Sequence, residues 1–319
     1  MLTITPSDLE SAAQLVYAAM PPTPQTYYPL LTQRAGCEVW VKHENHTPLG
    51  AFKVRGGLVY MDWLKRKHPE VRGVVTATRG NHGQSVAFAA HRNGLTATIF
   101  VPLGNSREKN AAMVALGGEL VEHGHDFQAA SEASQAYAQI HDLHHMPSYS
   151  PFLVAGVGTY SMELLRAHPD LKVIYVPIGL GSGISGAIAA RDALNLKTDI
   201  IGVVSEHAPA YALSFHSGKP TATESANTLA DGVACRVPNP SAVEFICAGA
   251  ADVVTVSEDE IKAAMRAYFT DTHNIAEGAG AVPLAGLLKQ RNLRRGQKVA
   301  VVLSGGNIDL DQYRAVLAE

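Results

Sequence analysis

Residues 172–193 read KVIYVPIGLGSGISGAIAARDA, and this stretch decides the fold. It opens with a β-branched run typical of a buried strand, continues through a glycine-rich turn and ends in a segment typical of a helix. Glycines let the backbone of such a turn approach a phosphate, and the amides that begin the following helix can hold it. The stretch therefore predicts a strand–turn–helix unit of an α/β protein, with an anion site at the turn.

The same alternation of strand and helix patterns continues along most of the chain. Short apolar runs predict strands at Val39–Lys42, Gly73–Thr76, Ala97–Val101, Lys172–Val176, Ile200–Val204, Val253–Val256 and Val299–Leu303. Helices are predicted at Val54–Lys65, Gln84–Arg92, Thr159–Arg166, Ile184–Ala193, Glu258–Tyr268 and Ala281–Leu288. This order predicts mostly parallel sheets flanked by helices.

One change in composition suggests two domains. No Lys or Arg occurs from Asn110 to Leu165, a range that ends shortly after two prolines. We expect a small domain over residues 49–149 and a large domain over residues 1–48 and 150–319, with a cleft between them in which a cofactor would sit.

The overall composition points to a small-molecule enzyme. The chain has 319 residues, 46% hydrophobic and 17% charged, with a formal net charge of −3. Neither a nucleic-acid surface nor a disordered acidic protein fits these values. No basic leader precedes an apolar run, and no stretch of 18 apolar residues follows, so we expect a cytoplasmic protein without a membrane partner. The three cysteines are scattered and predict no disulfide framework.

A second motif surrounds Lys53 in the stretch GAFKVRGG, residues 50–57. Phe52 and the small residues around the lysine can shield its amine from water, which lowers its pKa and frees the amine for Schiff-base chemistry. A lysine at a helix start is more often solvated surface, so this motif alone is weak.

Two further glycine turns follow predicted strands. The sequence TRGNHGQ, residues 78–84, precedes a helix, and its amides could bind a substrate carboxylate. The sequence LSGGN, residues 303–307, ends the last apolar strand. Ligands of open α/β sheets bind beyond the carboxyl ends of strands, so these turns could converge on one cleft.

The turn after residue 178 also fits another class of enzyme. Gly181, Gly183 and Gly186 satisfy the dinucleotide pattern G-x-G-x-x-G, and Glu206 lies where a ribose-binding acid is expected. A nicotinamide-dependent dehydrogenase is therefore an alternative from the glycines alone.

Taken together, the four motifs resemble the ordered signature of fold-type-II pyridoxal-phosphate enzymes, the threonine/serine dehydratase and serine racemase family. The stretches LADGVA at 229–234 and IAEGAGA at 275–281 also match, so the resemblance runs from about residue 40 to 310. A dehydrogenase would not account for Lys53 or for the turn around Asn81.

The resemblance implies roles for individual residues. Lys53 would carry pyridoxal 5'-phosphate as a Schiff base and act as general base, and Ser304 would meet the ring nitrogen. The residues implied to bind the cofactor are Phe52, Lys53, Asn81, Gly179, Gly181, Ser182, Gly183, Gly232, Glu277 and Ser304. Those implied to bind the substrate are Thr78, Arg79, Gly80, Asn81 and His82.

The resemblance also implies the reaction. A neutral hydroxyl at Ser304 makes the ring a weaker electron sink than an aspartate would, which suits prompt loss of a β-leaving group. We therefore expect a homodimeric dehydratase that eliminates water from a 3-hydroxy amino acid such as L-threonine or L-serine, giving a 2-oxo acid and ammonia.

The sequence departs from the family pattern at Arg79. Serine racemases resemble one another in carrying a serine there as second acid/base, and a guanidinium cannot replace it. Arg79 could instead read a second carboxylate, as in 3-hydroxyaspartate, or hold its loop through a salt bridge. Conversely, Met146, Tyr149 and Phe152 could furnish an apolar pocket suited to phenylserine.

Two alternatives remain open. Metal-binding relatives resemble this chain at Glu206 and Ala210, but the next expected carboxylate falls on Ala212, so a monovalent cation, a divalent cation or no metal fits. A protein that binds pyridoxal phosphate without catalysis, or a racemase, would be distinguished by the absence of ammonia release.

Overall fold

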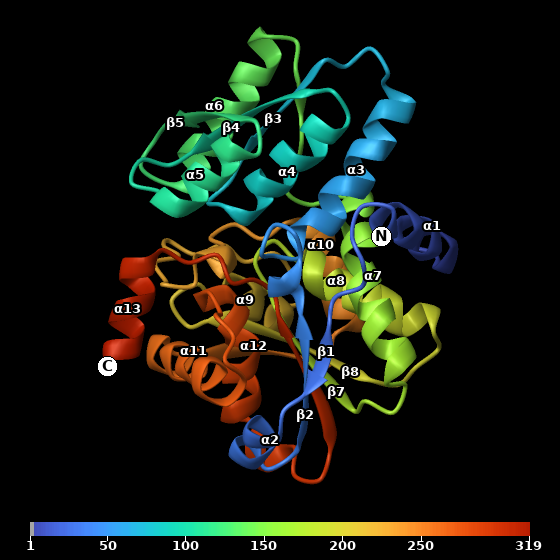
Figure 1. Cartoon of the computed structure of the whole chain (residues 1–319), viewed down its shortest axis with the longest axis vertical. Helices are drawn as coiled ribbons and strands as arrows, with labels where there is room; N and C mark the ends of the chain where they lie inside the picture. Colours follow the sequence, from blue (N-terminus) through green and yellow to red (C-terminus); the bar gives the residue numbers. More distant parts are fainter. Residues whose placement is uncertain (1–2) are drawn as a thin grey trace.

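The computed structural model describes residues 3–319, and the strands in that range form two sheets (Figure 1). The larger sheet has the order β1-β2-β10-β7-β8-β9, with β1 (Gln25–Tyr27), β2 (Glu38–His43), β7 (Val173–Pro177), β8 (Asp199–Ser205), β9 (Asp252–Val256) and β10 (Lys298–Leu303). The smaller sheet has the order β5-β4-β3-β6, with β3 (Gly73–Ala77), β4 (Thr96–Val101), β5 (Gly118–Glu122) and β6 (His144–His145). Neighbouring strands are parallel, apart from the antiparallel pair β1–β2.

Helices connect these strands. They are α1 (Pro6–Tyr17), α2 (Pro29–Ala35), α3 (Lys53–Lys67), α4 (Asn81–Arg92), α5 (Arg107–Ala115), α6 (Phe127–Ile140), α7 (Pro151–Ala167), α8 (Ser182–Ala193), α9 (Ala210–Ser217), α10 (Pro240–Gly249), α11 (Glu258–Thr272), α12 (Gly278–Lys289) and α13 (Leu310–Ala318). Short 3-10 turns lie at η1 (Glu44–His46), η2 (Asp231–Val233) and η3 (Arg291–Leu293). In residues 3–319, no helix is long and apolar enough to cross a membrane.

We call the smaller sheet with α3–α6 the small lobe, and the remainder the large lobe. Figure 1 places the small lobe above the large lobe, with α3 running up from the boundary between them. The predicted α/β class with two mostly parallel, helix-flanked sheets is confirmed. The strands of the smaller sheet fall between residues 49 and 149, while the exact domain limits stay a prediction.

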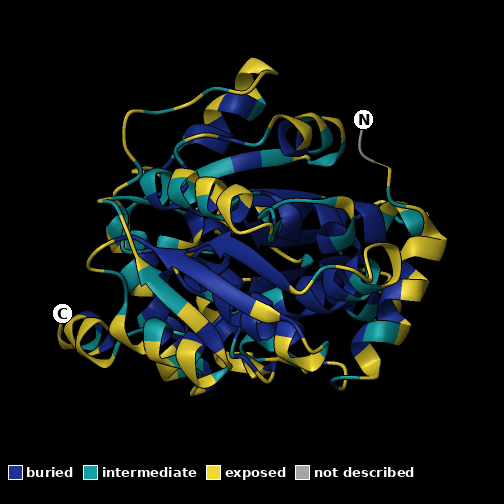
Figure 2. Cartoon of the chain, turned by 90° about the horizontal axis from the view of Figure 1, so that it is seen from above, coloured by how far each residue is buried: buried dark blue, intermediate teal, exposed yellow. Residues whose placement is uncertain are grey.

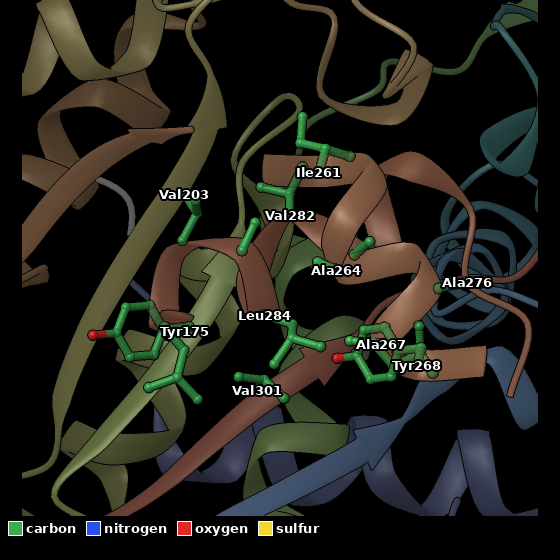
Figure 3. Packing of buried hydrophobic residues seen from close by; sticks show 14 of the residues in the cluster. Tyr175, Val203, Ile261, Ala264, Ala267, Tyr268, Ala276, Val282, Leu284 and Val301 are labelled. Atoms are coloured by element: carbon green, nitrogen blue, oxygen red, sulfur yellow. The ribbon is translucent and has the colours of Figure 1, made fainter. Parts of the chain in front are cut away.

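The large lobe has a hydrophobic layer on each side of its sheet. On one side α11 and α12 cover the strands, and Figure 3 shows Val282 and Leu284 of α12 among Tyr175, Val203 and Val301 from three strands. On the other side α7 and α8 pack against the sheet through a second apolar cluster. Figure 2 shows the inner strands buried and the outer helix faces exposed, as a sheet covered on both faces requires.

A buried ion cluster joins the start of α3 to the large lobe. The Arg55 guanidinium donates to Glu44 at 2.7 Å and to Glu163 of α7 at 2.6 Å, and Arg55 and Glu44 are fully buried. Lys42 of β2 donates to the same Glu163 at 2.5 Å. Removing one member of such a cluster leaves an uncompensated buried charge.

Helix α7 begins earlier than the sequence predicted. It starts at Pro151, where the Ser150 side chain accepts a hydrogen bond from the Leu153 amide, rather than at Thr159. Its near-continuous burial hid the helical period, because an apolar run without a polar face gives no periodicity.

We expect Arg55→Met to destabilise the protein by about 3–5 kcal/mol, because it leaves Glu44 buried without its cation and Glu163 with Lys42 alone. Denaturant unfolding measures this. Arg66→Met is the matched control: it removes an ion pair with the partly exposed Asp62 on the same helix and should cost about 1 kcal/mol or less. A cost for Arg55→Met as small as that of the control would contradict the assigned role of the cluster.

Candidate active site

A cavity of about 590 Å³ lies between the two lobes. Every residue that the family resemblance implied to bind cofactor or substrate lies in its wall: Phe52, Lys53, Thr78, Arg79, Gly80, Asn81, His82, Gly179, Gly181, Ser182, Gly183, Gly232, Glu277 and Ser304. The structure therefore brings the four motifs together, as the rule for carboxyl ends of parallel strands requires. The individual roles of these residues stay predictions.

Lys53 is the first residue of α3 and points across the cavity toward α8. Its Nζ donates to Ser182 Oγ at 3.4 Å and lies 4.6 Å from the centre of the Phe52 ring. Burial lowers the pKa of Lys53 to about 8, and the Glu277 carboxylate partly opposes this shift. A substantial share of the amine is therefore neutral near pH 8, which nucleophilic chemistry requires.

Four helices begin at the cavity, and the residue before each offers no side-chain cap to its first turn. They are α3, α4, α8 and α12, and they share this with α2, α9 and α13. First-turn amides without capping partners can bind a phosphate or a carboxylate. The turn before α8 needs a glycine at Gly181, where φ is +97°.

Backbone segments from distant motifs approach closely around the cavity. A Cβ atom at Gly179 would overlap the carbonyl oxygen of Gly232, and one at Gly232 would overlap the Ala279 side chain. Neither turn therefore has room for a side chain at its glycine. The Ser304 carbonyl accepts a hydrogen bond from the Phe52 amide at 3.0 Å. The end of β10 is thereby joined to the start of α3, next to Lys53.

The turn from residue 78 to 84 is shaped from within. The Thr78 hydroxyl accepts hydrogen bonds from the Gly80 amide at 2.9 Å and the Gly83 amide at 3.2 Å. The Asn81 side chain donates to Glu277 at 2.6 Å and accepts from Asn307 at 2.9 Å. These contacts fix the turn against the large lobe and leave the amides of its exposed edge available to a ligand.

His82 and Arg79 differ in how they use their polar atoms. His82 is buried, its Nε2 has no hydrogen-bond partner within residues 3–319, and burial lowers its pKa to about 3. The neutral imidazole is thus available to a ligand. Arg79 is exposed at the cavity wall.

The sequence analysis missed Lys109. This α5 residue is 5% exposed and lines the cavity, where its Nζ contacts Asp231 at 2.7 Å and Glu277 at 3.0 Å. Asp231 lies inside the LADGVA stretch, but no sequence pattern connects it with a lysine 122 positions earlier.

The structure contradicts two expectations, the salt bridge of Arg79 and the apolar pocket of Met146, Tyr149 and Phe152. Within residues 3–319 the Arg79 side chain makes no salt bridge, so it does not hold its loop in that way. Met146, Tyr149 and Phe152 do not line the cavity, because each already packs elsewhere. Met146 is fully buried in the small-lobe core, Phe152 stacks on Trp63 at 4.4 Å, and Tyr149 bonds to Ser185 at 3.1 Å.

The structure limits which residues could hold a metal ion. Glu206 is exposed, and Ala210 offers no side-chain ligand. In the part of the chain that the structure describes, no group of three or more His, Cys, Asp or Glu side chains is arranged to hold a metal ion.

The family assignment follows from comparison with known proteins. The family model of pyridoxal-phosphate dependent enzymes matches residues 16–305. The chain belongs to this family. The expected cofactor is therefore confirmed, and the nicotinamide alternative drawn from the glycine pattern is wrong, because the family that matches uses pyridoxal phosphate.

Named relatives agree with the expected lyase class. The chain is 33% identical over 315 residues to an L-threonine ammonia-lyase of Thermotoga maritima, covering 98% of this chain and 78% of the relative. It is 38% identical over 287 residues to an L-threonine ammonia-lyase of Geobacter sulfurreducens, covering 90% and 71%. The expected class, a pyridoxal-phosphate-dependent lyase of the dehydratase kind, is confirmed.

Solved structures agree with the fold. Threonine deaminase isoform 2 from Solanum lycopersicum superposes with a TM-score of 0.91 at 28% identity, covering 98% of this chain and 92% of that one. Maize serine racemase gives a TM-score of 0.91 at 26% identity, covering 98% and 97%. The expected fold-type-II family is confirmed.

The residues of the cavity fit pyridoxal phosphate. The uncapped start of α8 provides amides for a phosphate, and the close approach of Gly179 to Gly232 leaves no side chain in that turn. The Lys53 amine, its pKa lowered by burial, lies beside this turn and can be linked to an aldehyde. The neutral Ser304 hydroxyl lies in the same wall.

We expect Lys53 in the cofactor-free chain to react with acetic anhydride, a reagent that does not itself titrate, with a midpoint near pH 8, well below the value of about 10.4 for an ordinary lysine. Only the neutral amine reacts, so the rate rises as pH increases through the pKa. Mass spectrometry of the modified peptide gives the rate, and Lys53→Ala identifies the peptide. A midpoint near that of an ordinary lysine would contradict the burial described above.

Proposed function

We propose that this protein is a pyridoxal-phosphate-dependent dehydratase that removes water from a 3-hydroxy amino acid and releases a 2-oxo acid and ammonia. The observation that carries the proposal is the Lys53 amine, which lies beside the uncapped start of α8 in a cavity large enough for cofactor and substrate together. The relatives named L-threonine ammonia-lyase support the same reaction.

Each role in the reaction falls to a residue of the cavity wall. Bound pyridoxal phosphate supplies an aldehyde for amine linkage and a conjugated ring that withdraws electrons from the substrate α-carbon. The start of α8 binds phosphate oxygens, and the amides near Asn81 bind the substrate carboxylate. Lys53 accepts the α-proton. The α-proton and the β-hydroxyl group leave as water, and hydrolysis of the resulting enamine gives the 2-oxo acid and ammonia.

Racemisation is the weaker alternative. It needs a proton carrier on each face of the α-carbon, and Arg79 stands where the second carrier is expected. A guanidinium keeps its protons at all accessible pH values, so it cannot exchange one with the substrate.

Dehydratase activity is tested by measuring ammonia and 2-oxo acid release from L-serine, L-threonine, threo-3-hydroxyaspartate and phenylserine. We expect release from at least one of them and visible-edge absorbance from the purified protein. Lys53→Ala should lose both, while Lys67→Ala, at the exposed end of α3, should keep both. A coloured protein that releases no ammonia from the panel would instead support a non-catalytic binding protein.

One observation favours a substrate with a second carboxylate. Among the cations of the cavity wall, Lys109 contacts two carboxylates and Arg236 lies 3.7 Å from Asp126. In residues 3–319, the Arg79 side chain has no such protein partner and is exposed at the cavity wall. An uncommitted guanidinium beside the carboxylate-binding turn matches the charge of 3-hydroxyaspartate.

We expect threo-3-hydroxyaspartate to be the preferred substrate of the panel, and Arg79→Gln to lower its kcat/KM about tenfold, the value of a charge-assisted hydrogen bond of ~1.5 kcal/mol. The kcat/KM for L-threonine should stay nearly unchanged. Arg92→Gln, at the far end of α4 and outside the cavity wall, is the matched control. Equal losses for both substrates would argue against this role of Arg79.

The oligomeric state, the location and the domain limits also stay proposals. We infer a homodimer in the cytoplasm, and domain limits near residues 48 and 149, from the resemblance and from the ranges that the two sheets occupy.

A further inference from the structure

Lys109 reaches from the small lobe into a polar cluster of the large lobe. It lies on α5, and its Nζ contacts Asp231 of η2 at 2.7 Å and Glu277, the residue before α12, at 3.0 Å. The side chains of Lys109 and Glu277 are 6% and 3% exposed. Water therefore screens this interaction very little.

Glu277 connects Lys109 to the turn of residues 78–84. One of its carboxylate oxygens accepts from Lys109, and the other accepts from the Asn81 side chain at 2.6 Å. The Lys109 stem also occupies the space that a Cβ atom at Gly80 would need. Lys109 thus contacts the turn directly through its stem and indirectly through Glu277.

The charge of Glu277 depends on this lysine. Burial raises the pKa of Glu277 and Asp231 raises it further, while Lys109 acts in the opposite direction. Burial also opposes the charge of Lys109, but Glu277 and Asp231 outweigh it and raise the pKa of Lys109. Without Lys109, two neighbouring carboxylates would remain in a buried place, and one would take up a proton.

The same carboxylate acts on Lys53. Glu277 raises the pKa of the Lys53 amine, against the larger effect of burial. The other titratable group that faces Lys53 is His82, which burial keeps neutral. Glu277 is therefore the neighbouring charge that favours a proton on Lys53, while burial opposes it more strongly.

We propose that Lys109 is a positioning residue, which holds the Glu277 carboxylate against Asn81 and thereby fixes both the surroundings of Lys53 and the placement of the turn at Gly80. The inference rests on the role proposed for Lys53 in the dehydratase. Its readouts need no substrate, so failure of the dehydratase proposal would show in the amino acid panel and failure of this one would show here.

The test compares full-length Lys109→Met, Lys109→Arg and Glu277→Gln with the unaltered protein. Acetic anhydride modification gives the midpoint pH of the Lys53 amine in the cofactor-free chain, and titration with pyridoxal phosphate gives the Kd of the cofactor. Lys109→Met should lower the Lys53 midpoint by about one pH unit and raise the Kd about tenfold. Lys109→Arg retains the charge and should restore both values most of the way.

Coupling between the two residues gives a sharper criterion. Glu277→Gln should lower the Lys53 midpoint as Lys109→Met does, and the double variant should lower it no further than either single change, because both remove the same charge. If Lys109→Met fails to fold, the double variant is compared with Glu277→Gln instead, because it leaves one buried carboxylate fewer than Lys109→Met does.

Arg107→Gln is the matched control. Arg107 lies two residues before Lys109 and pairs with Asp311 of α13 at 3.2 Å, so it also joins the lobes but is exposed. It should leave the Lys53 midpoint and the Kd unchanged. If Lys109→Met lowers only the unfolding temperature and leaves the Lys53 midpoint where it was, Lys109 is a structural tie and the proposal is wrong.

Discussion

The buried Arg55 guanidinium is the interaction on which the geometry of the site depends. It is held by Glu44, which follows β2, and by Glu163 of α7, so the first turn of α3 cannot shift without exposing unpaired charge. Lys53 lies two residues earlier on the same turn. Since α7 packs along α8, the anchor that holds Arg55 also fixes the distance from Lys53 to Ser182. The position of the reactive amine is thus a property of the core.

The features that could be predicted from sequence are those written in short stretches. Glycine turns after β-branched runs gave the three strand-end motifs, and parallel topology brings carboxyl ends of strands to one edge. The residues of these motifs that were predicted to bind cofactor or substrate therefore lie around one cavity. Helices were placed well where a glycine or cap began them, and poorly where burial on all sides removed the period, as in α7.

The features that could not be predicted depend on partners far apart in the chain. Lys109 meets Glu277 across 168 positions, and neither residue belongs to a periodic pattern that would pair them. The same limit explains the error over the apolar pocket. The sequence shows an apolar side chain at Phe152, but it does not show that the Trp63 ring stacks on it. Assigning an apolar side chain to a cavity requires knowing which core it fills.

Two cations of the cavity wall, Lys109 and Arg79, differ in what they offer a substrate. Lys109 is buried and neutralised, so it contributes geometry but offers a ligand little attraction. Arg79 is exposed, and an exposed ion pair is worth only ~0.2–1 kcal/mol. A second carboxylate on the substrate can therefore be recognised strongly only if binding removes water from around Arg79. Lys109 holds the neighbouring turn at Gly80 against the large lobe, so this contact also fixes where Arg79 stands at the mouth of the cavity.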